Sequence, residues 1–375
     1  LVPQIYTKII YQKPMESPLM SKVYLIPARS GESEGQIRQK IQVLWRQAGL
    51  ANCFRKQDLA ALKLHVGEPG REPYVSPVIA AALVHCMKEA GTRPFLTDTA
   101  VLYKSRRDNG VDHTQVAYEH GFSIEGTGAP FIPADGLNGS EEIEVTVSGK
   151  HYETAAIASA AIQARSMLVL THATGHLGTG FAGALKNLGM GLSSKKGKLR
   201  QHSGQHPYID LKKCTSCGTC AVWCPEDAIT VNAGAEIVKG LCIGCGECVA
   251  MCLEGAVRFD WSIMGRELQE RIVEHAAAVV RGKRGHIGYV TVAMGITKDC
   301  DCLNKKQDPL CEDIGILASH DPVAIDLAVM ELVKERAGCT LESMSYPDRD
   351  GMIQVHYAAE LGLGQNSVEL VLLDI

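Results

Sequence analysis

The feature that most constrains this chain is a pair of identical cysteine spacings near its middle. Residues 214 to 224 read CTSCGTCAVWC and residues 242 to 252 read CIGCGECVAMC. Each segment follows the pattern C-x2-C-x2-C-x3-C, and the apolar positions that come after the first segment are matched after the second. Two similar half-modules with eight thiols are therefore expected, and few folds accommodate them.

This spacing is typical of segments that bind two [4Fe-4S] clusters. Three closely spaced thiolates hold one cluster, and the fourth, after a gap of three residues, reaches the other cluster. Two zinc sites are the alternative, but zinc needs only four ligands in pairs and leaves the third cysteine of each motif unexplained. The sequence therefore predicts one cluster on Cys214, Cys217, Cys220 and Cys252, and a second cluster on Cys242, Cys245, Cys248 and Cys224.

The composition bounds the compartment and the partners. Fourteen cysteines in a chain whose start lacks a continuous apolar leader favour a reducing cytosol, where thiols bind metals or do redox chemistry. Basic and acidic side chains nearly balance, with a formal charge of -4, which argues against nucleic acid as a partner. No apolar run reaches the roughly 20 residues that a membrane span requires. We expect a cytoplasmic protein without a membrane partner.

Strand and helix patterns alternate on both sides of the cysteine segment. Short apolar runs ending in polar residues predict strands, and runs with Pro near the start and Gly at the end predict helices. Such alternation indicates an α/β fold with a mainly parallel sheet and helices on both faces. The expected strands cover residues 20–28, 62–68, 94–99, 166–175, 285–295, 313–319 and 368–374, and the expected helices cover 34–50, 75–91, 112–121 and 321–338.

The alternation of strands and helices on both sides of the cysteine segment predicts the domain organisation. We expect one α/β domain in two parts, residues 20–206 and 260–375, interrupted by a ferredoxin-like α+β insert at residues 207–259. A tandem of independent domains is the alternative. Residues 1–19 precede Met20, which opens an ordinary first strand, and they are either an N-terminal extension or an edge segment of the fold.

Polar side chains follow the expected strands. In an open α/β sheet, ligands bind beyond the carboxyl ends of the strands. His65, Asp98, His172 and His176 stand at such ends, and they are candidates for proton transfer and anion binding. Both His172 and His176 could instead be hydrogen-bonded structural residues.

A glycine-rich stretch after residue 172 contains a literal G-x-G-x-x-G and then Lys186. A dinucleotide site is disfavoured, because the first of these glycines lies eight residues beyond Leu170, where the apolar run ends, and basic residues stand where a carboxylate is needed. A loop whose N–H groups and Lys186 bind a carboxylate or phosphate is the better interpretation. A solvated basic loop that packs against the insert is the alternative.

Three further cysteines lie downstream, in TKDCDCLNKKQDPLC. Cys300, Cys302 and Cys311, with Asp313 or His320 as a fourth ligand, could hold a metal ion or a further cluster. Alternatively, Cys300 and Cys302 form a redox dithiol, or all three are ordinary thiols. In an extended C-x-C the two side chains point to opposite faces, so any shared chemistry requires a bend.

Together, LHVGEPG, LTDTAVLY, AYEHGF, the glycine-rich stretch, the double cysteine motif, KDCDC and DIGILASHDPVAIDLA resemble the DUF362 family. The resemblance covers residues from about 20 to 375. It implies a ferredoxin module set in an α/β domain with two [4Fe-4S] clusters, and it names no substrate. Cys311 is not part of the pattern. The chain also resembles, more faintly, the nickel-pincer lactate racemases, because it has a lysine in a glycine-rich loop and scattered histidines.

The sequence favours an oxidoreductase. A partner protein would exchange electrons with the clusters, which would pass them to a small anionic substrate or metal centre in the α/β cleft. The competing hypotheses are a non-catalytic electron carrier or adaptor, a metal or cluster delivery protein, and an enzyme whose clusters are purely structural. The sequence does not indicate an oligomeric state.

Overall fold

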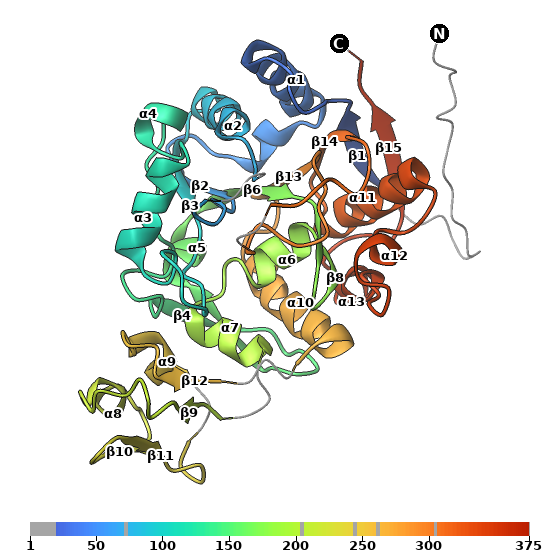
Figure 1. Cartoon of the computed structure of the whole chain (residues 1–375). Coiled ribbons are helices and arrows are strands. Elements are labelled where there is room, and N and C mark those ends of the chain that lie inside the picture. The colour runs from blue at the N-terminus through green and yellow to red at the C-terminus, as the bar shows by residue number, and fades with distance from the viewer. Residues whose placement is uncertain are drawn as a thin grey trace.

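The computed structural model describes residues 20–70, 74–202, 206–242, 246–259, 263–303 and 306–374. The expected extension at residues 1–19 lies outside the described residues. A seven-stranded sheet forms the centre of the molecule (Figure 1). Its strands, in spatial order, are β15 (Val368–Leu372), β1 (Ser21–Ile26), β14 (Gly315–Ser319), β13 (Ile287–Ala293), β6 (Ser166–His172), β2 (Leu59–Lys63) and β3 (Arg93–Thr97).

The sheet is mainly parallel, as predicted. β14 is antiparallel to both of its neighbours, and the other four pairings are parallel. β13 and β6 are buried along their whole length. Fully buried strands of this kind read as continuous apolar runs rather than as alternating ones. The centre of the sheet therefore combines a strand from before the cysteine segment with a strand from after it.

Helices cover both faces of the sheet, as predicted. Ile26, Leu62 and Leu170 face one apolar cluster, whereas Leu25, Ala61 and Val169 face the other, as the alternation of side chains along a strand requires. The first face packs against α1 (Glu34–Gln47), η1 (Leu50–Cys53), α2 (Pro77–Glu89), α3 (Gly110–Glu119) and the short α4 (Ile124–Thr127). The second face packs against α5 (Ser159–Gln163), α6 (Ala184–Gly189), α10 (Gly265–Gly282), α11 (Pro322–Ala337), α12 (Leu341–Ser345) and α13 (Met352–Glu360).

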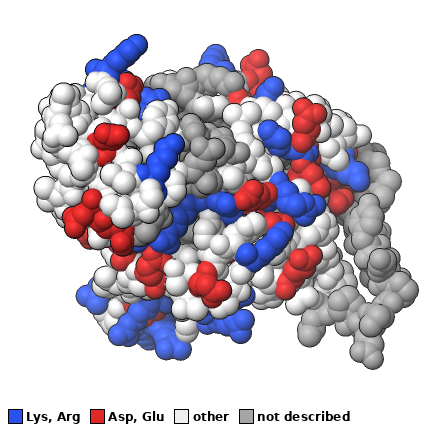
Figure 2. All heavy atoms as spheres, turned by 90° about the horizontal axis from the view of Figure 1, so that it is seen from below, with Lys and Arg blue, Asp and Glu red and all other residues white. Residues whose placement is uncertain are grey.

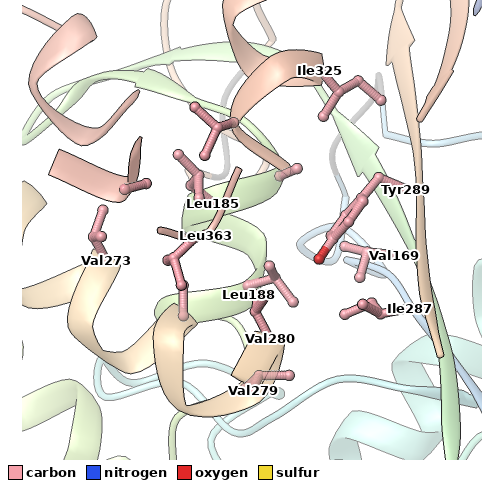
Figure 3. Close-up of a cluster of buried hydrophobic side chains, with 14 of the residues drawn as sticks. Val169, Leu185, Leu188, Val273, Val279, Val280, Ile287, Tyr289, Ile325 and Leu363 are labelled. Carbon is pink, nitrogen blue, oxygen red and sulfur yellow. The ribbon is translucent and has the colours of Figure 1, made fainter. Parts of the chain in front are cut away.

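The second face holds the larger core. Leu185 and Leu188 of α6 lie between α10, which contributes Val273, and the strand residues Val169 and Tyr289 (Figure 3). Each of these side chains is fully buried. Burying a side chain of this size stabilises a fold by roughly 1.5–3 kcal/mol. The position of α6 is therefore set by packing on both of its sides.

Several expected helices begin at the residues that the sequence indicates. Ser33 caps α1 in a capping box with Gln36, and Ser76 precedes Pro77 at the start of α2. Asp321 accepts hydrogen bonds from the N–H groups of Val323 and Ala324 at the start of α11. These caps satisfy backbone donors that have no partner within the helix.

Other elements differ from the expectation or were not foreseen. β2 begins at Leu59 and ends at Lys63, earlier than the apolar pattern suggested, so His65 and Glu68 belong to the loop after it. The 18-residue helix α10 was not predicted. Two hairpins were also missed, β4 (Glu142–Thr146) with β5 (Thr154–Ala158), and β7 (Thr174–His176) with β8 (Gly180–Ala182).

The cysteine segment forms a small region with its own apolar cluster (Figure 1). Its elements are β9 (Tyr208–Ile209), α8 (Thr219–Val222), β10 (Ile229–Val231), β11 (Ala235–Ile237), α9 (Glu247–Met251) and β12 (Val257–Arg258). It contacts the α/β part through α9, which packs against α7 (Lys195–His202). Among the described helices, none is long and apolar enough to cross a membrane.

Candidate functional site

A cavity of about 120 Å³ opens beyond the carboxyl ends of β2, β3 and β6. His65, Asp98 and His172 all line it, each a few residues at most from the end of its strand. Lys186, Cys300 and Cys302 complete the set of predicted residues in its wall. This is the position where open α/β sheets bind their ligands. The structure thus brings together six of the residues that the sequence singled out.

Asp98 lies at the centre of a buried charge cluster. Its carboxylate accepts a hydrogen bond from Lys63 Nζ at 3.0 Å, and it lies 3.6 Å from Arg107 Nη1 and 3.7 Å from His113 Nε2. Burial alone would raise the pKa of Asp98, but these neighbours together with His65 hold it well below its ordinary value. Asp98 is therefore a permanent anion that balances fixed cations.

Glu68 is the second anion of the cluster. It accepts two hydrogen bonds from Arg107, at 3.0 Å from Nε and 2.7 Å from Nη2, and one from the Tyr103 hydroxyl at 2.6 Å. Arg107 is almost completely buried. A fork of this kind fixes the plane of the guanidinium. Arg107 therefore faces the cavity as a rigid cation whose charge is already shared with Glu68 and Asp98.

Lys186 reaches the cavity from the first turns of α6. It is only 8% exposed, and among the described residues its ammonium has no hydrogen-bond partner. Burial lowers the pKa of Lys186, but the facing Cys300, Cys302 and Asp301 outweigh burial and raise it. Asp326 of α11 holds the start of this helix, because its carboxylate accepts hydrogen bonds from the N–H groups of Ala184 and Leu185 at 2.6 and 2.9 Å.

Asn187, the next residue of α6, ties this helix to the sheet. Its side-chain oxygen accepts a hydrogen bond from Lys63 Nζ at 2.7 Å, and its amide nitrogen donates to Leu170 O and Thr171 Oγ1. Each hydrogen-bonding atom of the amide is thereby used. The ammonium of Lys186 thus lines the same cavity as Lys63 and Arg107.

Cys302 lies opposite His65, with 3.7 Å between Sγ and Nε2. Hydrogen bonding by Cys300, together with Lys186 and His65, lowers the pKa of Cys302 well below its ordinary value despite burial. The same hydrogen bond and burial raise the pKa of Cys300. The two thiols therefore differ in acidity, and Cys302 is the more acidic of the pair.

Both ring nitrogens of His172 have partners, so His172 is not a free base. Its Nδ1 lies 2.9 Å from Asp301 Oδ2, and its Nε2 lies 2.9 Å from the carbonyl oxygen of Met294. A carbonyl oxygen can only accept a hydrogen bond, so Nε2 carries a proton. His172 therefore orients Asp301, the residue between the two cysteines.

Two predicted site residues lie elsewhere. His176 is not in the cavity wall; its Nδ1 accepts from the N–H groups of Gly178 and Thr179, which closes the β7–β8 hairpin. Cys311 also lies outside the wall, half-buried near Arg336 and Cys339. Of the three downstream cysteines, the structure therefore places Cys300 and Cys302 together in the cavity wall and Cys311 outside it.

The proposed fourth ligands of that grouping are engaged elsewhere too. Asp313 accepts hydrogen bonds from the N–H groups of Ser30 and Gly295, and His320 contacts Cys53 Sγ and the carbonyl oxygen of Ala48. Neither lines the cavity. In the part of the chain that the structure describes, no group of three or more Cys, His, Asp or Glu side chains is arranged to hold a single metal ion.

α7 connects the cavity to the cysteine segment. Lys198 and His202 of this helix line the cavity, and burial lowers the pKa of Lys198 to about 8 and that of His202 to about 3. From the same helix, Leu199 lies against Gly246, and Lys195 Nζ donates to the carbonyl oxygen of Ala250 at 3.4 Å. One helix thus contacts both regions.

Seven of the motif cysteines, all those that the structure describes, line two separate small cavities. The cavities are lined by Cys214, Cys217, Cys220 and Cys252 in one case, and by Cys224, Cys242 and Cys248 in the other. Cys245 lies outside the described residues. Each cavity is thus lined by cysteines of one motif together with the fourth cysteine of the other motif. Each thiolate of a cubane cluster bonds to a different iron, so cluster ligands stand further apart than the ligands of one metal ion.

Backbone N–H groups point at several of these sulfurs. Ala228 N lies 3.2 Å from Cys224 Sγ, and Ala256 N lies 3.2 Å from Cys252 Sγ, at equivalent positions of the two half-modules. Ala235 N lies 3.4 Å from Cys214 Sγ. Hydrogen bonds to cluster sulfurs are one of the means by which a protein sets the reduction potential. The donor set and its surroundings fit an iron–sulfur cluster.

Several cavity residues were not anticipated. Lys63 carried a signal, since it is a lone charge in an otherwise apolar strand pattern, and a buried lysine requires partners. Arg107, Lys198 and Asn187 carried none. They come from a loop and from two helices whose places depend on tertiary packing, and their spacing along the chain does not bring them together.

Comparisons with known proteins give one family. The family model described as "Domain of unknown function (DUF362)" matches residues 60–331. A search of curated proteins found no match. Solved structures with some similarity include a lactate racemase apoprotein from Thermoanaerobacterium thermosaccharolyticum, with 11% identity and a TM-score of 0.39, covering 74% of this chain and 52% of that one. A structural-genomics target from Thermotoga maritima has 10% identity and a TM-score of 0.42, covering 84% and 59%. The chain thus spans less than two thirds of either.

Proposed function

We propose, from the premise that this chain belongs to the DUF362 family of domains of unknown function, that it is an iron–sulfur oxidoreductase acting on a small anionic substrate. A partner protein would exchange electrons with two [4Fe-4S] clusters in the cysteine segment. The observation that carries the proposal is the crossed grouping of the cysteines, beside a helix that also forms a wall of a basic cavity.

The proposed cluster ligands are the two crossed sets of four cysteines. When bound, the clusters supply one-electron transfer at low potential. The N–H groups of Ala228 and Ala256 would stabilise the charge on Cys224 and Cys252. Gly246 has φ 82° and lies against Leu199 of α7, so a side chain at this position would collide with the α/β part. This close approach favours transfer between the two regions.

The cavity favours an anion. Lys63 and Arg107 are already balanced by Asp98 and Glu68, whereas Lys186 has no hydrogen-bond partner among the described residues. A buried ammonium is stabilised by an anion within hydrogen-bonding distance. Because Asp98 is held as a permanent anion and His172 is bound to Asp301, we assign proton transfer to His65 and the Cys300 thiol rather than to Asp98 or His172.

The exposed side chains of the cysteine segment support a protein partner. Val222 and Trp223 adjoin Cys224, and Leu253 adjoins Cys252; they are 82%, 50% and 86% exposed. Apolar side chains around a redox centre are suited to transient docking of another protein. Figure 2 shows basic and acidic side chains interspersed over one face of the molecule, which does not favour nucleic acid as a partner.

A non-catalytic electron carrier is the second candidate, and the same exposed apolar side chains favour it. It requires no ligand in the cavity, whereas a buried Lys186 whose ammonium has no hydrogen-bond partner among the described residues favours an anion there. A delivery protein with a labile ion on Cys300, Cys302 and Cys311 is disfavoured, because Cys311 lies apart from the other two.

The experiment is metal and sulfide analysis of anaerobically purified protein, with EPR of the reduced state. We expect about eight iron and about eight sulfide for each chain. Because Cys252 lies with Cys214, Cys217 and Cys220, the Cys252→Ala variant should lose about four iron and one of the two EPR signals. Cys339→Ser, at an exposed position outside both sets, is the control. Zinc in place of iron, or loss of both signals in Cys252→Ala, would contradict the proposal.

A further inference from the structure

A tight turn brings the two thiols of the C-x-C segment to one side. The N–H of Leu303 donates to the carbonyl oxygen of Cys300 at 3.1 Å, which closes a turn over residues 300–303. Both Cys300 and Cys302 line the cavity as a result, and their side chains are within hydrogen-bonding reach of each other. An extended backbone would have sent them to opposite faces. The geometry needed for a shared reaction is therefore present.

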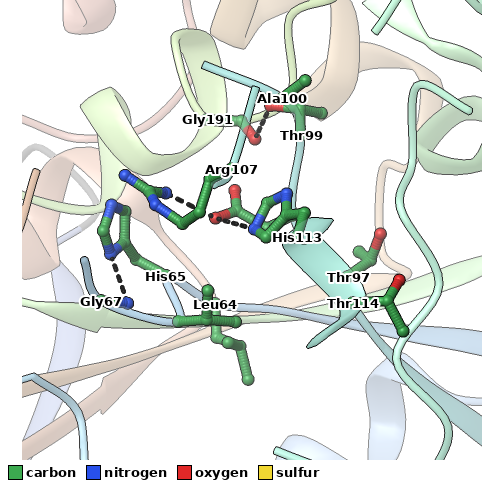
Figure 4. Close-up of polar contacts among 12 residues, drawn as sticks. Leu64, His65, Gly67, Thr97, Thr99, Ala100, Arg107, His113, Thr114 and Gly191 are labelled. Carbon is green, nitrogen blue, oxygen red and sulfur yellow. Dashed lines mark hydrogen bonds and ion pairs between the residues drawn. The ribbon is translucent and has the colours of Figure 1, made fainter. Parts of the chain in front are cut away.

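The hydrogen bonds of His65 show where its proton lies. The N–H of Gly67 donates to His65 Nδ1 at 3.0 Å (Figure 4), so Nδ1 is unprotonated and the ring carries its proton on Nε2. That N–H faces Cys302 Sγ. His65 therefore faces the sulfur with Nε2 as a hydrogen-bond donor, and Lys186 supplies the positive charge that balances a thiolate.

The two thiols have unequal access. Cys302 keeps part of its surface open, whereas Cys300 is 7% exposed. In thiol–disulfide exchange the accessible thiolate attacks first, and the protonated neighbour resolves the mixed disulfide. The arrangement therefore assigns different roles to the two residues.

We propose that Cys300 and Cys302 are a redox dithiol that reduces a small anionic disulfide, with Cys302 as the attacking thiolate, Cys300 as the resolving thiol and Lys186 as the binding site for the anion. This deepens the proposed function, and it rests on that function only for the source of electrons. The class of substrate follows from Lys186: attack consumes the charge of the thiolate, and an anionic substrate keeps the buried ammonium balanced.

Atoms, protons and electrons are conserved through the proposed exchange. Cys302 Sγ attacks one sulfur of the substrate, the substrate S–S bond breaks, and one substrate thiolate leaves. The Cys300 thiol gives its proton to that thiolate, and Cys300 Sγ attacks Cys302 Sγ, which releases the second substrate thiolate and closes a Cys300–Cys302 disulfide. Two electrons from one-electron donors of the iron–sulfur class, with one proton, restore the thiol and the thiolate.

The test uses three disulfides of equal chain length on the full chain with its iron–sulfur content intact. Dithiodipropionate is anionic, bis-hydroxyethyl disulfide is neutral and cystamine is cationic. Each rate is divided by the rate with a free cysteine peptide, which removes the intrinsic reactivity of the probe. We expect a preference of about tenfold for the anionic probe over the neutral one, which corresponds to about 1.4 kcal/mol.

Mass spectrometry of the peptide that contains residues 300–302 identifies the product. Wild type should end as the internal disulfide, Cys300→Ser should accumulate one probe fragment on Cys302, and Cys302→Ser should stay unmodified in this peptide. Lys186→Gln should lose the charge preference and Lys186→Arg should keep it. Cys339→Ser, at an exposed position outside the cavity, is the matched control for thiol loss.

A persistent probe adduct in wild type would overturn the resolving role of Cys300. An unchanged charge preference in Lys186→Gln would overturn the anion site. Both the adducts and the charge preference are measured on the reaction of the thiols, so they do not depend on the iron content. A protein that lacks iron but shows the expected trapping would refute the proposed electron source and leave the dithiol standing.

Discussion

Asp326 illustrates how a single buried residue controls the cavity from a distance. It lies on α11, is fully buried, and accepts hydrogen bonds from the two N–H groups that begin α6. Lys186 follows these N–H groups by one residue. Burial raises the pKa of Asp326 to about 7, although the bonds from Leu185 and Ala184 oppose it. The residue is therefore partly protonated near neutral pH.

Replacing Asp326 by Asn should change how stability depends on pH. The folded protein holds the Asp326 proton more tightly than the unfolded chain does, so the contribution of Asp326 to the free energy of unfolding falls as pH rises from about 4 to about 7. Asn does not titrate. Between about pH 5 and about pH 8, the free energy of unfolding of wild type should fall by about 2–3 kcal/mol relative to that of Asp326→Asn. Urea unfolding at both pH values measures this difference. An equal change in the free energy of unfolding for the two proteins would refute the prediction.

At the scale of residues, the sequence predicted which side chains line the cavity better than it predicted the buried partners that fix their charges. His65, Asp98, His172, Lys186, Cys300 and Cys302 line the cavity. They were identifiable because strand ends in an α/β sheet converge on one edge. Their roles were less predictable. Asp98 was expected to transfer protons, but Lys63 and Arg107 hold it as an anion, and neither cation is near it in sequence.

At the scale of elements, α6 packs closely against α10 and carries residues of the cavity wall. A side-chain carbon on Gly189 of α6 would collide with the carbonyl oxygen of Ile272 in α10. Gly189 has no positive φ, so its small size and not its backbone freedom is what the position uses. The two helices pack backbone against backbone, and α6 carries Lys186 and Asn187 to the cavity.

Gly189→Ala and Gly282→Ala should therefore have opposite effects on stability. At Gly189 the methyl group must push α6 from α10, and such overpacking costs about 1–3 kcal/mol. Gly282, in the last turn of α10, has no atom within 4 Å of the added carbon, so Ala should stabilise the helix by about 0.5–1 kcal/mol. Urea unfolding of both variants tests the comparison. Equal effects would mean that α6 and α10 separate easily.

The sequence predicted elements with clear end signals and missed those defined by contacts. α2 and α11 have Pro in the first turn and Gly soon after the end, and both lie within a few residues of the expected ranges. α10 begins just after the cysteine segment, where the repeat was expected to end, and it was not assigned. The glycine-rich stretch forms the β7–β8 hairpin and the start of α6 rather than one loop, because its glycines serve close packing.

At the scale of the whole molecule, two large cores flank the sheet and a third, very small one lies in the cysteine segment. The third consists of Cys220, Ile229, Ala235, Cys248 and Val257, and two of these five are proposed cluster ligands. So few apolar residues cannot stabilise a fold alone. The cysteine segment should depend on its clusters for structure, whereas the α/β part should not.

Removing iron with a chelator should make the cysteine segment sensitive to protease. We expect cleavage within residues 207–259, with two large fragments from the flanking parts that resist further digestion. These fragments should stay together in size-exclusion chromatography, because β13 pairs with β6 across the cut. Protein with intact clusters, digested in parallel, is the control. Cleavage spread along the chain, or fragments that separate, would show that the α/β part also requires iron.

The pairing of β6 with β13 also sets an order in time during synthesis. The ribosome releases β1, β2, β3 and β6 before β13, and β6 remains with one apolar edge unpaired until β13 emerges. All of the motif cysteines emerge during that interval, between His172 and Ile287. Because domains begin to fold while they are being made, and an open strand edge attracts other chains, slow translation through this interval prolongs the period of greatest aggregation risk. The supply of iron and the speed of translation therefore act on the same nascent intermediate.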